Sequence, residues 1–260
     1  MSSQLQFGAI MAPANQEWWW YFDQTGAQVA QLLTQNKAML TDINAYVIDN
    51  TVKYAVVMAP ANRTWWWYFG QTAEQVSQLL IQNKAMLTDI SAYVDVDHRL
   101  KFAVIMTPAN QGWWWYFGQT AEQVGQLLAE NKARLTDISA YVDLDHTRKF
   151  AVIMAPANQE WWWYFGQTGE EVNQLLTKNN AMLTDINAYV DVYSAETTLD
   201  RGNTKVSKEE NWTKAMFAVI MTPANQTWWW YYGVTASELG EYLTKNKARL
   251  TAVSPFVLSP

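Results

Sequence analysis

One pattern of apolar and polar positions recurs five times along this chain. In its second copy, Lys53–Met58 is a short apolar run with β-branched residues, which predicts a strand that is covered on both faces. The turn residues Ala59–Asn62 follow, and the aromatic run Trp65–Phe69 then predicts a second strand that forms an antiparallel hairpin with the first. A later run, Met86–Val94, predicts a third strand, and the polar segment Asp95–Arg99 predicts a turn into the next copy.

Between the second and third strands the pattern predicts a helix. Thr72 and Gln75 have the spacing of a capping box, in which each side chain accepts a hydrogen bond from the other residue's backbone amide. The same spacing recurs at Thr25/Gln28, Thr120/Gln123, Thr168/Glu171 and Thr235/Glu238. The apolar residues that follow lie three and four positions apart, on one helical face: Val76, Leu79 and Leu80. We expect the helix to end near Asn83 and Lys84, because asparagine tolerates the left-handed conformation of a helix stop.

The copies are close in sequence and nearly evenly spaced. The proline of the turn recurs at intervals of 47, 48, 48 and 67 residues, at Pro13, Pro60, Pro108, Pro156 and Pro223. The longest interval contains a segment rich in charged residues and threonine, which we expect to be an exposed loop, because additions to a repeat usually lie on one face. The sequence therefore predicts a single repeat domain over residues 1–260. Its expected parts are repeats at about 5–52, 53–100, 101–148, 149–192 and 216–258, and an inserted loop at 193–215.

A repeat that cannot bury its own apolar face must stack on its neighbours. The expected fold class is therefore an α+β tandem repeat of five strand–strand–helix–strand units, with the helices outside. Five complete units can form a closed fivefold toroid, like an α/β propeller, in which the last strand lies beside the first and no sheet edge stays free. An open curved array is the alternative.

The tryptophans are the most informative residues of each copy. All but one of the 16 occur as triplets: Trp18–Trp20, Trp65–Trp67, Trp113–Trp115, Trp161–Trp163 and Trp228–Trp230. Because side chains alternate along a strand, Trp65, Trp67 and Phe69 share one face, which we expect to lie in the core under the helix. Trp66 and Tyr68 then face a central channel or concave surface.

An indole exposed on such a surface can stack on the C–H face of a sugar ring, while neighbouring polar groups supply hydrogen bonds. The candidate ligand-binding residues are the middle tryptophan of each triplet, the tyrosine two positions later and the asparagine of the preceding turn. They are Trp19, Trp66, Trp114, Trp162, Trp229, Tyr21, Tyr68, Tyr116, Tyr164, Tyr231, Asn15, Asn62, Asn110, Asn158 and Asn225. The alternative is that the tryptophans only fill a thin core and that the asparagines only form turns.

Two further sets of polar residues recur. Four copies carry an aspartate in the third strand, at Asp42, Asp89, Asp137 and Asp185, whereas the fifth copy has Ala252. We expect these carboxylates to face water or to pair with nearby lysines such as Lys37, Lys84 and Lys132. His98 and His146 lie in equivalent turns of two copies only, where solvated surface groups are expected rather than catalytic or metal-binding ones.

Composition narrows the functional classes. The net charge is −6 without a basic cluster, which argues against a nucleic-acid partner, and no apolar run approaches the ~20 residues of a membrane span. With no cysteine, no Gly-rich phosphate loop and no catalytic serine or zinc motif, we expect neither an enzyme nor a cofactor or metal site. The first residues do not resemble a signal peptide, so localisation stays open between the cytoplasm and secretion without one.

The run from Phe102 through Trp113–Gly118 and the Thr120-led helix to Tyr141 resembles a bacterial and fungal tandem repeat that forms the non-catalytic N-terminal region of polyglycine hydrolases. In that family the hydrolase activity resides in an attached β-lactamase-like serine domain, and this chain contains no Ser-x-x-Lys motif. The resemblance implies a scaffold for binding or recruitment and transfers no catalytic residue. The α/β propeller of guanidine-modifying enzymes offers only a topological analogy, since those enzymes need a catalytic cysteine.

The sequence therefore favours a non-enzymatic, multivalent, lectin-like protein that binds carbohydrate or a glycoprotein. A scaffold that recruits a protein or peptide, and a purely structural repeat array, are the alternatives.

Overall fold

The computed structural model describes residues 4–201 and 204–258, with side chains described for 4–191 and 213–258. Within these residues the chain forms five three-stranded sheets, each accompanied by one helix.

Sheet I has β2 (Trp19–Gln24), α1 (Gly26–Asn36), β3 (Ala38–Ile48) and β4 (Thr51–Pro60). Sheet II has β5 (Trp66–Gln71), α2 (Ala73–Asn83), β6 (Ala85–Val94) and β7 (Leu100–Pro108). Sheet III has β8 (Trp114–Gln119), α3 (Ala121–Asn131), β9 (Ala133–Val142) and β10 (Arg148–Pro156). Sheet IV has β11 (Trp162–Gln167), α4 (Gly169–Asn179), β12 (Ala181–Arg201) and β13 (Thr204–Pro223). Sheet V has β14 (Trp229–Val234), α5 (Ala236–Asn246), β15 (Ala248–Leu258) and β1 (Gln4–Pro13).

The helix boundaries follow from local chemistry, as the sequence predicted. All five helices begin with the expected capping box. Each ends at a left-handed residue, which is Asn180 in α4 and a lysine in the other four helices, for example Lys84 with φ 50°. The asparagine before that residue, such as Asn83, was expected to adopt this conformation. It stays helical instead, and its side chain donates a hydrogen bond to a tyrosine of the tryptophan-bearing strand.

The pairing of the strands differs from the expected hairpin. In sheets I to IV the strand that begins in a tryptophan triplet pairs with the first strand of the following copy, as β2 does with β4, and not with its own predecessor. In sheet V, β14 of the last copy pairs with β1 of the first. The true hairpin joins the third strand to the next first strand: β3 turns into β4 through Asp49 and Asn50, both with positive φ. A two-residue turn of this kind matches the twist of a hairpin, whereas the proline turn carries the chain from one sheet to the next.

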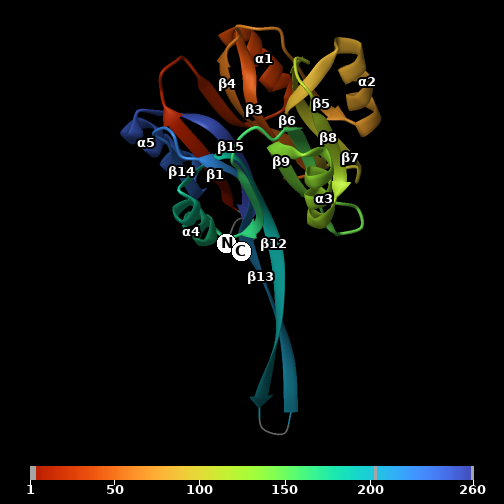
Figure 1. Cartoon of the computed structure of the whole chain (residues 1–260). Coiled ribbons are helices and arrows are strands. Elements are labelled where there is room, and N and C mark those ends of the chain that lie inside the picture. The colour runs from red at the N-terminus through yellow and green to blue at the C-terminus, as the bar shows by residue number, and fades with distance from the viewer. Residues whose placement is uncertain (1–3, 202–203, 259–260) are drawn as a thin grey trace.

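The middle strand of each sheet is buried on both faces, as its uninterrupted apolar sequence predicted. In sheet V this middle strand is β1, which pairs with β14 on one side and β15 on the other, so that Gln4 lies opposite Leu258. The first and last described segments of the chain are therefore partners in one sheet (Figure 1).

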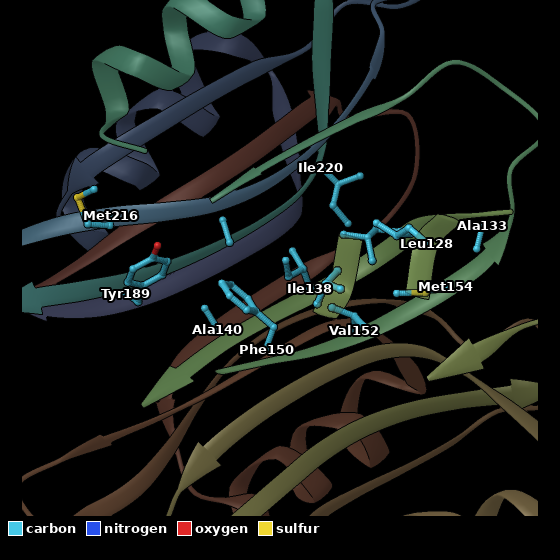
Figure 2. Packing of buried hydrophobic residues seen from close by; sticks show 13 residues of the cluster. Leu128, Ala133, Ile138, Ala140, Phe150, Val152, Met154, Tyr189, Met216 and Ile220 are labelled. Atoms are coloured by element: carbon cyan, nitrogen blue, oxygen red, sulfur yellow. The ribbon is translucent and has the colours of Figure 1, made fainter. Parts of the chain in front are cut away.

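The core is divided into five apolar clusters, each between two sheets and under one helix. The α3 cluster, for example, joins Ile138 and Phe150 of sheet III to Tyr189 and Ile220 of sheet IV (Figure 2). The other clusters join sheets I and II under α1, II and III under α2, IV and V under α4, and V and I under α5. The strands β3, β6, β9, β12 and β15 contact one another in that order, and β15 also contacts β3. These strands lie toward the middle of the body, with the helices at its outside (Figure 1).

The insertion does not form the expected loop in the described backbone. It extends β12 and β13 into a long two-stranded arm that projects away from the rest of the molecule (Figure 1). The pairing continues without a shift from Asp185 opposite Ile220 to Arg201 opposite Thr204. In the described part of the chain, every helix is too short or too polar to cross a bilayer.

Candidate functional site

The tryptophan triplets lie at the edge of each sheet, where the chain enters β2, β5, β8, β11 and β14, and all their side chains are partly buried. Their side chains alternate between faces, as predicted. Trp19 packs into the α1 cluster between sheets I and II, whereas Trp18 and Trp20 pack into the α5 cluster between sheets V and I. The same division holds in the other four copies.

The assignment of these faces, however, is the reverse of the expected one. The middle tryptophan and the tyrosine after it lie on the side of their own helix, as Trp66 and Tyr68 do under α2. Trp65 and Trp67 pack toward the preceding helix, α1, and Phe69 is 40% exposed rather than in the core. Because the sheets pack face to face and the strands that carry the triplets form the edge remote from the inner strands, the middle tryptophans do not face a central channel.

The tyrosine of the candidate site has a defined partner in each copy. Its hydroxyl accepts a hydrogen bond from the side-chain amide of the last helical asparagine, as Tyr21 does from Asn36 at 3.0 Å. The other four pairs, at 2.8–3.1 Å, are Asn83–Tyr68, Asn131–Tyr116, Asn179–Tyr164 and Asn246–Tyr231. This bond fixes the helix over the tryptophan-bearing strand and accounts for the asparagine that was expected to end the helix.

The end of that strand is fixed by another tyrosine. The amides of Asp23, Gly118 and Gly166 donate to the hydroxyls of tyrosines on the third strand, including Tyr46 and Tyr141, at 2.8–2.9 Å. Burial raises the pKa of both Tyr46 and Tyr141 to about 12. Two neighbouring positions of the strand, Tyr21 and Asp23 in the first copy, are thus bonded to the helix and to an inner strand.

The turn asparagines are separated from the tryptophans. Asn15, Asn62, Asn110, Asn158 and Asn225 are all exposed. Asn62 lines a hollow of about 300 Å³ together with Gln16, Arg63 and Met39, and no tryptophan borders it. The structure therefore brings the tryptophan and the tyrosine of the candidate site together but does not bring the asparagine to them.

A groove does form between the first tryptophan-bearing strand and α5, the helix of the preceding sheet. There it measures about 410 Å³ and is lined by Trp18–Tyr21 together with Gly240, Leu243 and Thr244. Every lining residue is uncharged. Indole faces, a hydroxyl and an open mouth are features of a site for a small neutral ligand.

The recurring aspartates, expected on the surface, lie on the inner strands, where Asp42 and Asp137 are buried and Asp89 and Asp185 are half-buried. Each accepts a hydrogen bond from a backbone amide of the neighbouring sheet: Asp137 from Ile90 at 2.6 Å, and Asp42 from Val253 at 3.1 Å. Asp89 and Asp185 accept in the same way from Ile43 and Ile138. The lysines expected to pair with them end the helices and are exposed.

Burial, followed by repulsion from neighbouring carboxylates, raises the pKa of Asp42, Asp89 and Asp137 well above the ordinary value. Burial also raises the pKa of Asp185, which shares a hydrogen bond with Asp137. Two carboxyl groups can share a hydrogen bond only when one carries a proton. In the described residues, no three acidic, histidine or cysteine side chains are arranged to hold a metal ion.

A second layer of polar side chains, two residues further along, joins the same strands and was missed from sequence. Ser91, Ser139 and Ser254 accept from the amides of Ala45, Ala92 and Ala188 at 2.8–2.9 Å. Asn187 accepts from Ala140 at 2.9 Å. The available signal was the polar residue two positions after each aspartate, at Asn44, Ser91, Ser139, Asn187 and Ser254.

The two histidines lie on the surface, as expected. His98 and His146 lie at the left-handed position of the exposed hairpin loops after β6 and β9, with φ 55° and 61°. No family model matches this chain, and a search of curated proteins gives no relative. The resemblance to the repeats of polyglycine hydrolases therefore rests on the motif alone.

Proposed function

We propose that this chain is a non-enzymatic, multivalent carbohydrate-binding protein of lectin type, whose sites are the grooves between the tryptophan triplets and the neighbouring helices. The observation that carries the proposal is the uncharged groove lined by Trp18–Tyr21 and α5, on the face of the strand that carries the indoles of Trp18 and Trp20. Aromatic faces bind the apolar C–H faces of sugars, while indole N–H and hydroxyl groups bind their oxygens. A chain of net charge −6 also favours neutral over acidic sugars.

The proposed site differs from the one expected from sequence. It keeps Trp19, Tyr21 and their counterparts, adds the flanking tryptophans, and leaves the turn asparagines outside. The resemblance to the repeats beside polyglycine hydrolases agrees with a binding role without catalysis.

We further propose that the five sheets close into a fivefold toroid rather than an open array. The proposal is supported by β1, which supplies the middle strand between β14 and β15, and by the hydrogen bond from the Val253 amide to Asp42. A closed body would hold the grooves at fixed separations, and simultaneous engagement of several sites can raise avidity by roughly 10² to 10⁴.

A glycan array of neutral and acidic oligosaccharides, followed by calorimetric titration of the best neutral ligand, tests the function. We expect binding by the wild-type protein and about a tenfold loss of affinity in Trp20→Phe, which keeps a ring in place but removes the indole N–H. Leu144→Ala, which removes an exposed apolar side chain (54% exposed) from the β9–β10 hairpin, is the matched control and should bind normally. Failure to bind any array member, with the protein folded, would contradict the proposal.

The projecting arm favours a second function, the recruitment of a protein. A long paired hairpin offers free backbone edges to which another chain can add a strand. If this is the main function, removal of residues 193–215 will abolish capture of a defined protein partner while leaving the body folded. If the chain binds neither sugar nor protein, it is a purely structural repeat array.

A further inference from the structure

The five copies are not equivalent, because the fifth residue of the helix varies between them. In two copies it is seen beside the third tryptophan of the following sheet: Asn173 bonds Trp230, and Gly240 lines the groove with Trp18–Tyr21. The fifth helical residue is Ala30 in α1, Ser77 in α2, Gly125 in α3, Asn173 in α4 and Gly240 in α5. Its side chain therefore determines how much of the groove stays open.

Beside α4, a side chain occupies the edge of the third indole, next to an open hollow of about 420 Å³ lined by Asn173, Gln174, Thr177 and Lys178. Asn173 accepts a hydrogen bond from the indole Nε1 of Trp230 at 2.9 Å. Tyr232 stacks on Trp230 with ring centroids 4.8 Å apart and donates to Glu170 of the same helix at 3.1 Å. Both polar atoms of this aromatic pair are thus bound to α4, and the edge of Trp230 is occupied.

The groove beside α5 is open at the same point. Gly240 has no side chain, and a Cβ atom built on it would meet no neighbouring atom within 4 Å. Gly125 of α3 has the same free space beside it. In the regions with described side chains, the only indole for which a hydrogen bond is found is that of Trp230. The indole N–H of Trp20 is therefore left to a ligand or to water.

We propose that the groove between α5 and Trp18–Tyr21 is the primary sugar subsite and that it takes a neutral pyranose ring with equatorial hydroxyls. At the counterpart in sheet V, Asn173 occupies the indole N–H of Trp230 that a sugar would need. This inference rests on the proposed carbohydrate-binding function. Equatorial hydroxyls leave the C–H faces of the ring flat, which suits an indole surface, and the uncharged lining offers no partner for an acidic sugar. The indole N–H of Trp20 donates to a ring hydroxyl, and the Gly125 groove at Trp161–Trp163 is the second site by the same criterion.

Exchanging the two residues tests the assignment. Gly240→Asn places the closing side chain beside Trp20, and Asn173→Gly removes it from Trp230. In titrations with cellotetraose, we expect Gly240→Asn to remove one bound equivalent and to weaken binding about tenfold. Asn173→Gly should add one equivalent, and Leu144→Ala, in the exposed β9–β10 hairpin outside the groove, should bind like the wild type.

A readout without sugar separates this inference from the proposed function. N-bromosuccinimide oxidises accessible indoles, and peptide mapping locates the oxidised residues. In the wild-type protein we expect Trp20 to react faster than Trp230. The oxidation of Trp20 should be slower in Gly240→Asn, and that of Trp230 should be faster in Asn173→Gly. If the wild type binds sugar but Gly240→Asn binds equally well, the subsite is wrong while the function stands. If no neutral oligosaccharide binds, both the function and the subsite fail. Equal oxidation of Trp20 and Trp230 would overturn the difference between the grooves itself.

Discussion

At the scale of single residues, the four aspartates of the inner strands link the stability of the body to pH. Each carboxyl group accepts a hydrogen bond from a neighbouring backbone amide. Burial nevertheless raises the pKa of these groups above the value in an unfolded chain, and repulsion between carboxylates adds to this for Asp42, Asp89 and Asp137. The folded state therefore binds protons more tightly than the unfolded state. Their contribution to stability is complete below the ordinary pKa of about 3.9 and is lost as pH rises through the folded-state pKa.

Asp137→Asn should remove part of this pH dependence. The amide keeps an oxygen to accept from Ile90, and its NH₂ group donates to Asp185 without needing a proton. Urea unfolding should show that the variant is more stable than the wild type at pH 8 by on the order of 1 kcal/mol, with a smaller difference at pH 5. Asp97→Asn, at an exposed hairpin position, should change neither value. A pH-independent difference would show that charge is not the cause.

These aspartates also mark a limit of prediction at this scale. The alternation of Trp65, Trp66 and Trp67 was predicted correctly, because it depends only on strand geometry. The choice of face, and the partial burial of Asp89, depend on which sheet packs against which and on which strand is innermost. Neither can be read from one strand, and a charged residue with lysines nearby looks like a surface group.

At the scale of elements, local chemistry determined most of what could be predicted. The predicted helix after Thr72 and the strand Met86–Val94 agree with α2 and β6 to within about two residues. The predicted hairpin between Lys53–Met58 and Trp65–Phe69 was wrong, because proximity in sequence suggested pairing within one copy. The Asp49–Asn50 dipeptide was the better turn signal, and it joins different copies.

The capping boxes give a prediction at this scale. In α3 the Thr120 side chain accepts from the Gln123 amide at 3.3 Å, and the Gln123 side chain accepts from the Thr120 amide at 2.8 Å. Thr120→Ala removes one of these two bonds and should lower the free energy of unfolding by about 1 kcal/mol. Thr120→Ser keeps the hydroxyl and should stay within a few tenths of a kcal/mol of the wild type. Equal urea midpoints for the alanine and serine variants would contradict this role.

At the scale of the whole molecule, near-repetition of one unit coexists with differences that make the copies unequal. Ala252 replaces the fifth aspartate, and the Ile186 amide is instead bonded by Asp185 of its own strand. The arm belongs to sheet IV alone, and the helix residue beside each groove varies. Copy number was evident from sequence, but the consequence of each difference appeared only once the neighbouring sheets were known. The repeated positions thus build the scaffold, and the substituted positions distinguish one copy from another.

Closure of this scaffold can be tested through β1. Phe7, Ile10 and Met11 are at most 2% exposed, and burial of each such side chain contributes about 1.5–3 kcal/mol. Removing residues 1–13 should therefore leave β14 and β15 without their middle strand and should unfold or aggregate the protein, as shown by circular dichroism and size-exclusion chromatography. A circular permutant serves as the control: it begins at Thr204, ends at Arg201 and joins the old termini by a short Gly/Ser linker. It keeps β1 and should melt within a few degrees of the wild type, because Gln4 lies opposite Leu258 and a short linker can join the ends. In an open array β1 is only a terminal strand. A truncated protein that stays folded and monomeric would therefore exclude the toroid. If the truncated protein unfolds and the permutant stays folded, the two ends of the chain must meet.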